Sequence, residues 1–142
     1  MRSLNALQPF GLLALRLALG IIFFSHGYPK LAHLGSGTQS CMACSQVFFV
    51  EHGLPGYFVY VAGVLEVFGG LMLMLGLFTR PAALLLATEM AVAIWKVHSS
   101  KGYLAVHEYE FPLTLAVACF ALATVGAGAF SLDQPLFERV HK

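Results

Sequence analysis

Four stretches of mostly apolar residues constrain the fold of this chain more than any other feature. They cover residues 9–28, 54–78, 81–97 and 110–132. A helix needs about 20 apolar residues to cross the hydrocarbon core of a bilayer. Only 11% of the residues are charged, whereas a soluble domain carries about 25%. The sequence therefore predicts an all-α integral membrane protein, folded as a bundle of four membrane-spanning helices.

The spans also predict the domain organisation and the orientation. All 142 residues form one predicted membrane domain. Four spans place both termini on one side of the membrane. The positive-inside rule assigns the side with more Lys and Arg to the cytoplasm. We expect cytoplasmic termini, because this puts four of the flanking cations inside and three outside: Arg2, Arg80, Arg139 and Lys142 against Lys30, Lys96 and Lys101. The long loop 29–53 is then external, in a multi-pass protein of the inner membrane.

Net charge and cysteine content exclude several function classes. The formal net charge of +1 gives no electrostatic footprint for nucleic acid. Three cysteines cannot form a multi-disulfide scaffold. There is no haem-attachment motif, because Ser45 rather than His follows the CxxC sequence that ends at Cys44.

Three charged residues fall inside the predicted spans, where an isolated charge is costly. Helical rise puts Arg16 and Glu89 each about 10–12 Å from the cytoplasmic end and Glu66 roughly 18 Å from it. We expect the three to meet in a buried polar core. One cation for two carboxylates requires a proton, a hydroxyl, a water or a ligand to balance the charge. Such a core either holds the bundle together or binds a ligand or proton.

Polar and aromatic residues collect at the predicted outer ends of the spans. His and Lys can donate hydrogen bonds to the carbonyl oxygens of a quinone, and aromatic rings can stack on its head group. An interfacial belt has the same composition. A metal held by His26, His98, His107 and Glu110 is a weaker alternative, since the spacing matches no metal motif, and no metal site is predicted. The candidate quinone-binding residues are His26, Lys30, Lys96, His98 and Glu110.

The predicted external loop contains Cys41 and Cys44 at CxxC spacing. Two thiols at this spacing can form a structural disulfide, and the arrangement can also lower the pKa of one thiol and make the pair redox-active. An external dithiol above a quinone site could pass two electrons from thiols to quinone. Cys41 and Cys44 are therefore candidate catalytic residues.

Several sequence motifs follow one another in order along the chain. They are Leu15-Arg16-Leu17 through Gly20, Phe23, His26, Gly27 and Lys30; Leu65-Glu66-Val67-Phe68-Gly69-Gly70; Gly76-Leu77-Phe78-Thr79-Arg80; Ala82-Ala83; and Gly126-Ala127-Gly128-Ala129-Phe130-Ser131-Leu132-Asp133. Together these motifs resemble the DoxX family of small bacterial and archaeal membrane proteins, over nearly all of residues 8–135. The resemblance implies a four-helix membrane bundle and association with quinone-linked oxidoreductase systems. It also implies that Arg16, His26, Lys30, Glu66 and Arg80 correspond to polar residues of the family.

The sequence thus predicts a redox-linked membrane protein that binds quinone or quinol in its outer half within an oxidoreductase system. If it is an enzyme, it is a quinone-linked oxidoreductase or a subunit of one. One alternative is a non-catalytic anchor or assembly subunit, whose glycines Gly63, Gly69, Gly70 and Gly76 would pack against a partner helix. A second alternative is a small proton-coupled transporter. Expected partners are membrane lipid and other membrane or redox proteins, and a homo-oligomer is left open.

Overall fold

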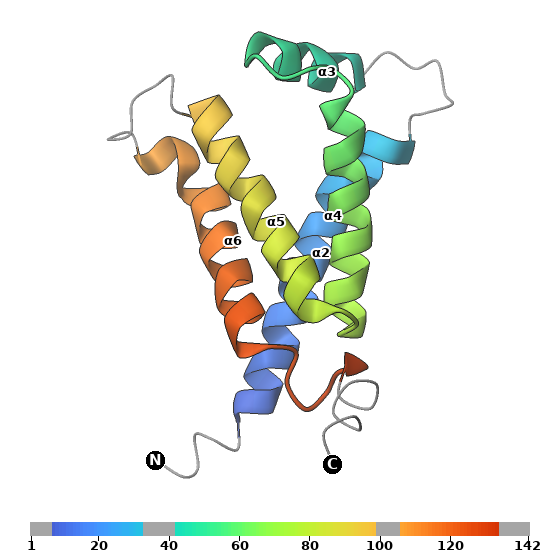
Figure 1. Ribbon diagram of the computed structural model, residues 1–142, viewed down its shortest axis with the longest axis vertical. Helices are drawn as coiled ribbons and strands as arrows, with labels where there is room; N and C mark the ends of the chain where they lie inside the picture. The colour runs from blue at the N-terminus through green and yellow to red at the C-terminus, as the bar shows by residue number, and fades with distance from the viewer. Residues whose placement is uncertain (1–6, 33–41, 99–105, 134–142) are drawn as a thin grey trace.

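The computed structural model describes residues 7–32, 42–98 and 106–133, and within these ranges it is all-helical with no strand (Figure 1). Two helices, α2 and α4, are long and apolar enough to cross a membrane, and a shorter apolar stretch covers Tyr109–Val125 in α6. The all-helical class is therefore confirmed for the described residues, and two of the four predicted spans are present as candidate membrane-spanning helices. The elements are α2 (Gln8–Ala32), α3 (Met42–Glu51), α4 (Phe58–Leu75), α5 (Thr79–Ala93), the π-helical turn η1 (Ile94–His98) and α6 (Val106–Val125).

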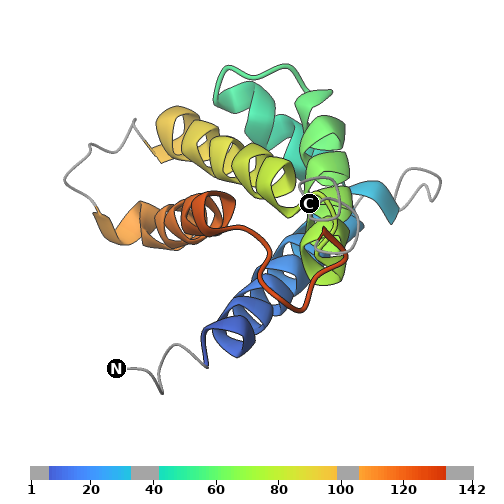
Figure 2. The ribbon, with the colours of Figure 1, turned by 60° about the horizontal axis from the view of Figure 1, so that its bottom comes forward.

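The long helices form two antiparallel pairs. Helix α2 packs along α4, and α5 packs along α6, with smaller contacts between α4 and α5 and between α2 and α6. Figure 2 shows α5 and α6 side by side, with α2 and α4 on the other side of the molecule. The two pairs diverge toward the end where α3 lies (Figure 1).

Four glycines let α2 and α4 approach closely. They are spaced by seven residues on each helix, and because the helices are antiparallel, Gly20 faces Gly70 and Gly27 faces Gly63. A Cβ at Gly20 would lie 2.7 Å from the Gly70 carbonyl oxygen, and a Cβ at Gly70 would lie 2.7 Å from that of Gly20. Residues without a side chain allow this backbone contact.

The glycines proposed as a docking surface for a partner helix are occupied within the chain. A Cβ at Gly63 would meet Lys30 and Leu31, and one at Gly69 would meet Leu86. Gly70 packs on α2, and Gly76 packs on the Arg16 guanidinium. The expectation that these four residues are free for a partner is therefore wrong.

The apolar core lies where the two pairs meet, on the side away from α3. Its large members come from all four long helices, and small residues of α5 let α6 pack closely against them. Residues on the outer faces, such as Phe68, Val117 and Phe120, are exposed, as expected of surfaces that contact lipid tails. The core consists of Leu19, Phe23, Leu73, Ala82, Ala83, Leu86, Ala87, Leu115, Cys119 and Leu122.

Two local features differ from the sequence-based expectation. The predicted loop 29–53 contains the ten-residue helix α3, which is tied to α4 by a 2.8 Å hydrogen bond from Gln46 Nε2 to the Tyr60 hydroxyl. The turn between α4 and α5 lies at Gly76–Phe78, and Thr79, Arg80 and Pro81 form the first turn of α5. Gly76 has the left-handed φ of 67°, and Leu77 N–H donates to the Met72 carbonyl, which closes α4 as in a Schellman motif.

Candidate functional site

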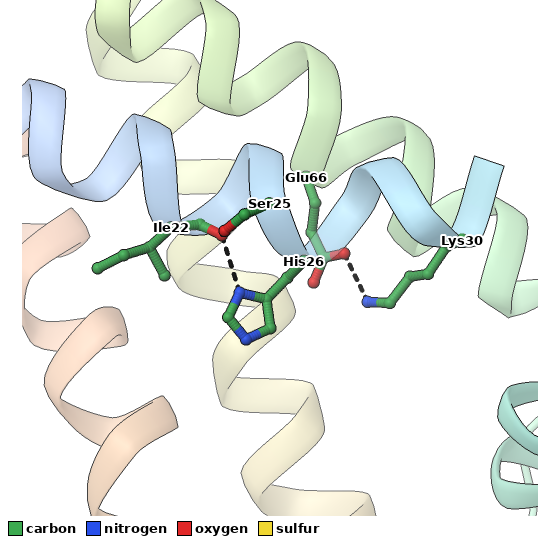
Figure 3. Close-up of polar contacts among 5 residues, drawn as sticks. All are labelled: Ile22, Ser25, His26, Lys30 and Glu66. Atoms are coloured by element: carbon green, nitrogen blue, oxygen red, sulfur yellow. Dashed lines mark hydrogen bonds and ion pairs between the residues drawn. The ribbon is translucent and has the colours of Figure 1, made fainter. Parts of the chain in front are cut away.

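A partly buried ion pair joins α2 to α4 in the half of the molecule nearer α3. Lys30 Nζ lies 2.5 Å from Glu66 Oε2 (Figure 3). The Glu66 side chain is 6% exposed and that of Lys30 is 23% exposed. Glu66 is eight residues from the start of α4 and nine from its end, so its carboxylate sits near the middle of an apolar helix.

The antiparallel packing of α2 and α4 brings these two side chains together. Gly27 and Gly63 set the local contact, because a Cβ at Gly27 would lie 2.7 Å from Glu66 Cβ and one at Gly63 would lie 3.0 Å from Lys30 Cβ. Side chains on a helix lean toward its N-terminus. Lys30 and Glu66 therefore lean toward each other, since each lies one turn past its glycine on helices that run in opposite directions.

Glu89 of α5 completes the group. Gly69 of α4 packs on Leu86 of α5, so in this antiparallel register Glu66, three residues before Gly69, is level with Glu89, three residues after Leu86. Glu89 lies within electrostatic range of both Glu66 and Lys30. We call Lys30, Glu66 and Glu89 the paired-charge cluster. The predicted proximity of Glu66 to Glu89 is present in the structure, and the cation beside them is Lys30.

The paired-charge cluster holds one ammonium group and two carboxyl groups. Glu66 Oε2 accepts a hydrogen bond from Lys30, whereas Glu89 Oε2 is buried and has no hydrogen-bond partner in the described part of the chain. Positive and negative charges in a membrane interior normally balance each other, because an unbalanced charge is poorly solvated there. The cluster can therefore bind a proton or a polar ligand in addition to Lys30.

His26 lies one turn before Lys30 on the same face of α2 (Figure 3). Its Nδ1 is 2.8 Å from the Ile22 carbonyl oxygen. Since a carbonyl only accepts hydrogen bonds, Nδ1 carries the proton, and in the neutral ring Nε2 is an acceptor. The His26 side chain is exposed, and its ring centroid lies 6.0 Å from that of Phe111 on α6. It offers a hydrogen-bond acceptor beside the paired-charge cluster.

Arg16 does not join the two glutamates as expected. It is 1% exposed, and its Nη2 donates to the Phe130 carbonyl. Its guanidinium packs on Gly76, ten residues beyond Glu66 on α4, which corresponds to about 15 Å along the helix. The prediction assumed that equal depth brings charges together, but the register of α2 against α4 brings Lys30 to Glu66 and Arg16 to the end of α4.

Asp133 is a structural residue that the sequence reasoning missed. Its carboxylate accepts hydrogen bonds from Phe78 N–H at 2.6 Å and from Thr79 N–H at 2.9 Å. These amides begin α5, whose N-cap residue Phe78 makes no side-chain cap and has a left-handed φ of 49°. Asp133 thus caps a helix that begins 54 residues earlier. The signal was the absence of Ser, Thr, Asp or Asn immediately before Thr79.

The remaining candidates fall into two groups. Lys96 Nζ lies 4.9 Å from the ring centroid of its neighbour Trp95, and Glu110 is exposed as the fifth residue of α6. Cys41 and the side chains of Cys44 and His98 lie outside the described residues. Among residues that are described, no three His, Cys, Asp or Glu side chains gather as metal ligands do.

Comparison with known proteins identifies several relatives that are bacterial membrane proteins or are similar to this chain over most of its length. Residues 11–99 match the DoxX family. A Bacillus subtilis protein named "Putative oxidoreductase CatD" is 31% identical over 95% of this chain and 93% of its own length. The inner membrane protein YqjF of Escherichia coli is 30% identical over 94% and 97%. An uncharacterized membrane protein of Mycobacterium tuberculosis is 30% identical over 97% and 88%.

These similarities extend over almost the whole chain, and no solved structure matches it. The names of the relatives and the apolar helices agree in one respect. The chain is an inner-membrane protein whose apolar outer faces contact lipid.

Proposed function

Because this chain belongs to the DoxX family, we propose that it is a redox-linked membrane protein that binds quinone or quinol within an oxidoreductase system. The binding site comprises the paired-charge cluster and His26, in the half of the molecule nearer α3. The proposed topology has four spans, α2, α4, α5 with η1, and α6, with the start of α2 and residue 133 at the cytoplasmic side. Lys30, Glu66 and Glu89 then face the outer half of the membrane.

The observation that carries this proposal is the presence of the paired-charge cluster between apolar helices. Ionisable residues within membrane spans are functional candidates by default, and here the Glu89 carboxyl has a buried oxygen with no hydrogen-bond partner in the described part of the chain. Ammonium, carboxyl and imidazole groups can bind the two oxygens of a quinone head group. One relative carries the name "Putative oxidoreductase CatD", which agrees with this class of function.

Cys41 and Cys44 would supply the electrons in this proposal. Two thiols lose two electrons and two protons as they form a disulfide, and a quinone that takes up two electrons and two protons becomes a quinol. The chemistry therefore balances for a dithiol and one quinone. Lys96, His98 and Glu110 belong to the same outer half of the proposed topology and are its further candidate ligand residues.

Quinone binding is tested on the full chain purified in lipid nanodiscs. We expect ubiquinone or menaquinone in an organic extract of the wild-type protein, and saturable binding of a short-chain ubiquinone analogue. Glu66→Gln should lose most of the binding, and Glu51→Gln, which changes an exposed carboxylate on α3, should retain it. If no quinone is extracted and none binds, the anchor or transporter interpretation replaces this one.

The thiol step is tested separately in intact cells with a membrane-impermeant thiol reagent. We expect Cys41 and Cys44 to be oxidised during respiration and to become labelled when quinol oxidation is inhibited. A pair that stays oxidised under inhibition is a structural disulfide. A pair that cannot be labelled even after external reduction contradicts the proposed topology.

A further inference from the structure

The two carboxyl groups of the paired-charge cluster differ in their partners. Glu66 Oε2 lies 2.5 Å from the Lys30 ammonium. Glu89 Oε2 is buried, yet has no hydrogen-bond donor within reach among the described residues. An ionised carboxylate is solely an acceptor and needs donors, whereas a protonated carboxyl carries its own O–H donor. The lack of a donor at Glu89 Oε2 among the described residues favours the protonated form.

The charges around Glu89 favour the same form. Helix α4 presents Glu66 to it and α2 presents Lys30, which is already paired with Glu66. The buried α6 residues of the core are apolar: Leu115, Cys119 and Leu122. Among the titratable groups on the other described elements around Glu89, His26 of α2 is exposed beside Phe111, and Glu110 of α6 is exposed. Lys96, two turns beyond Glu89, lies over Trp95. In the described part of the chain, Glu89 therefore has no cation of its own, and a second negative charge beside Glu66 would be repelled and poorly solvated.

We infer that Glu89 is a neutral carboxylic acid that donates a hydrogen bond to a carbonyl oxygen of the bound ligand. This inference rests on the proposed function and names the chemistry that its site recognises, an oxidised quinone ring. The Lys30–Glu66 ion pair is what keeps the proton on Glu89. The carbonyl oxygen of a quinone is a stronger hydrogen-bond acceptor than the hydroxyl of a quinol, so Glu89 contributes more to quinone binding than to quinol binding.

The protonation is tested without any ligand, by infrared difference spectroscopy of the full chain in nanodiscs. We expect the carbonyl stretch of a buried carboxylic acid in the wild-type protein. It should disappear in Glu89→Gln and persist in Glu51→Gln. Absence of this band in the wild type, or its persistence in Glu89→Gln, overturns the inference whatever the protein does with quinone.

The ligand contact is tested with a short-chain ubiquinone analogue and its quinol. Glu89→Gln retains an N–H donor and should bind the quinone within about threefold of the wild type, whereas Glu89→Leu should lose about tenfold. Loss of quinol affinity in Glu89→Leu should be smaller. Equal quinone affinity of Glu89→Leu and the wild type overturns the contact, while the proposed function stands. No binding to the wild type overturns the proposed function, and the infrared band then decides the protonation alone.

Discussion

Two groups of charged residues lie in the helical part of this molecule, and they differ in what satisfies them. At the end away from α3, the partners of Arg16 and Asp133 are backbone atoms: the Phe130 carbonyl accepts from Arg16 Nη2, and two amides donate to Asp133. Arg16 Nε and Nη1 are buried and have no hydrogen-bond partner among the described residues. In the paired-charge cluster, Lys30, Glu66 and Glu89 depend on one another, and one carboxyl oxygen has no described partner.

This difference separates a structural role from a functional one. Backbone partners are fixed by the fold, so charges bound to them tie segments together. Arg16 and Asp133 join α2, the start of α5 and residues 126–133, which we call the closing segment. Side-chain partners can exchange protons or accept a ligand with little change in the backbone. We therefore expect mutations near Arg16 and Asp133 to change stability and mutations in the paired-charge cluster to change binding.

The largest expected effect is at Gly76. A Cβ there would overlap the Arg16 guanidinium and lie 2.7 Å from Ser131 Cβ, at a φ of 67°. Gly76→Ala should destabilise the protein by about 3 kcal/mol through backbone strain and overpacking. Thermal unfolding in detergent measures this, with Gly11→Ala as the control, because a Cβ at Gly11 meets nothing within 4 Å. Equal melting temperatures would show that the closing segment does not depend on this contact.

A smaller loss of stability is expected at Asp133. Asp133→Ala removes the acceptor for the first amides of α5 and should cost about 1–2 kcal/mol. Asp133→Asn, which keeps one side-chain oxygen, should recover part of this loss. Quinone affinity per folded molecule should stay unchanged in both variants. A loss of affinity without a loss of stability would contradict the division of roles between the two groups of charges.

In the paired-charge cluster, Glu66→Gln should cost about 1 kcal/mol of stability, because the amide oxygen of Gln can still accept a hydrogen bond from Lys30. Lys30 loses its negatively charged partner in this variant, and the remaining cation then favours the ionised form of Glu89. The infrared band of the neutral carboxylic acid should therefore disappear although Glu89 itself is unchanged. A band that persists in Glu66→Gln would mean that burial alone, and not the Lys30–Glu66 pair, keeps the proton on Glu89.

The sequence predicts helix class and membrane location well, because both depend on the length and apolarity of single segments. It predicts less well which charged side chains of different helices pair with each other. Arg16 was assigned to the glutamates from its depth and its face within a single helix, whereas the register depends on Gly20, Gly27, Gly63 and Gly70 acting together across two helices. The seven-residue glycine spacing was visible on α4, but its match on α2 becomes meaningful only once the helices are known to be antiparallel neighbours.

The long-range cap was equally inaccessible to local reasoning. A residue before Thr79 with an oxygen-bearing side chain would have marked the start of α5, but the acceptor comes from Asp133. Helix α3 was missed for another reason. It is a short helix within a polar loop, and its packing on α4 through Gln46 and Tyr60 depends on tertiary contact rather than on periodicity.

The smallest expected effect on stability, and the sharpest test of the binding site, is at His26. His26→Phe keeps an aromatic ring beside Phe111 and removes the unprotonated Nε2, and at this exposed position stability should change by about 0.5 kcal/mol or less. An acceptor nitrogen favours the hydroxyl of a quinol, so quinol affinity should fall about five- to tenfold while quinone affinity changes less.

Glu89→Leu should show the opposite preference, because it removes a donor. Equilibrium titrations with a short-chain quinone and its quinol compare the two variants directly. If both variants lose the same redox form, His26 and Glu89 do not contact opposite sides of one ligand as donor and acceptor.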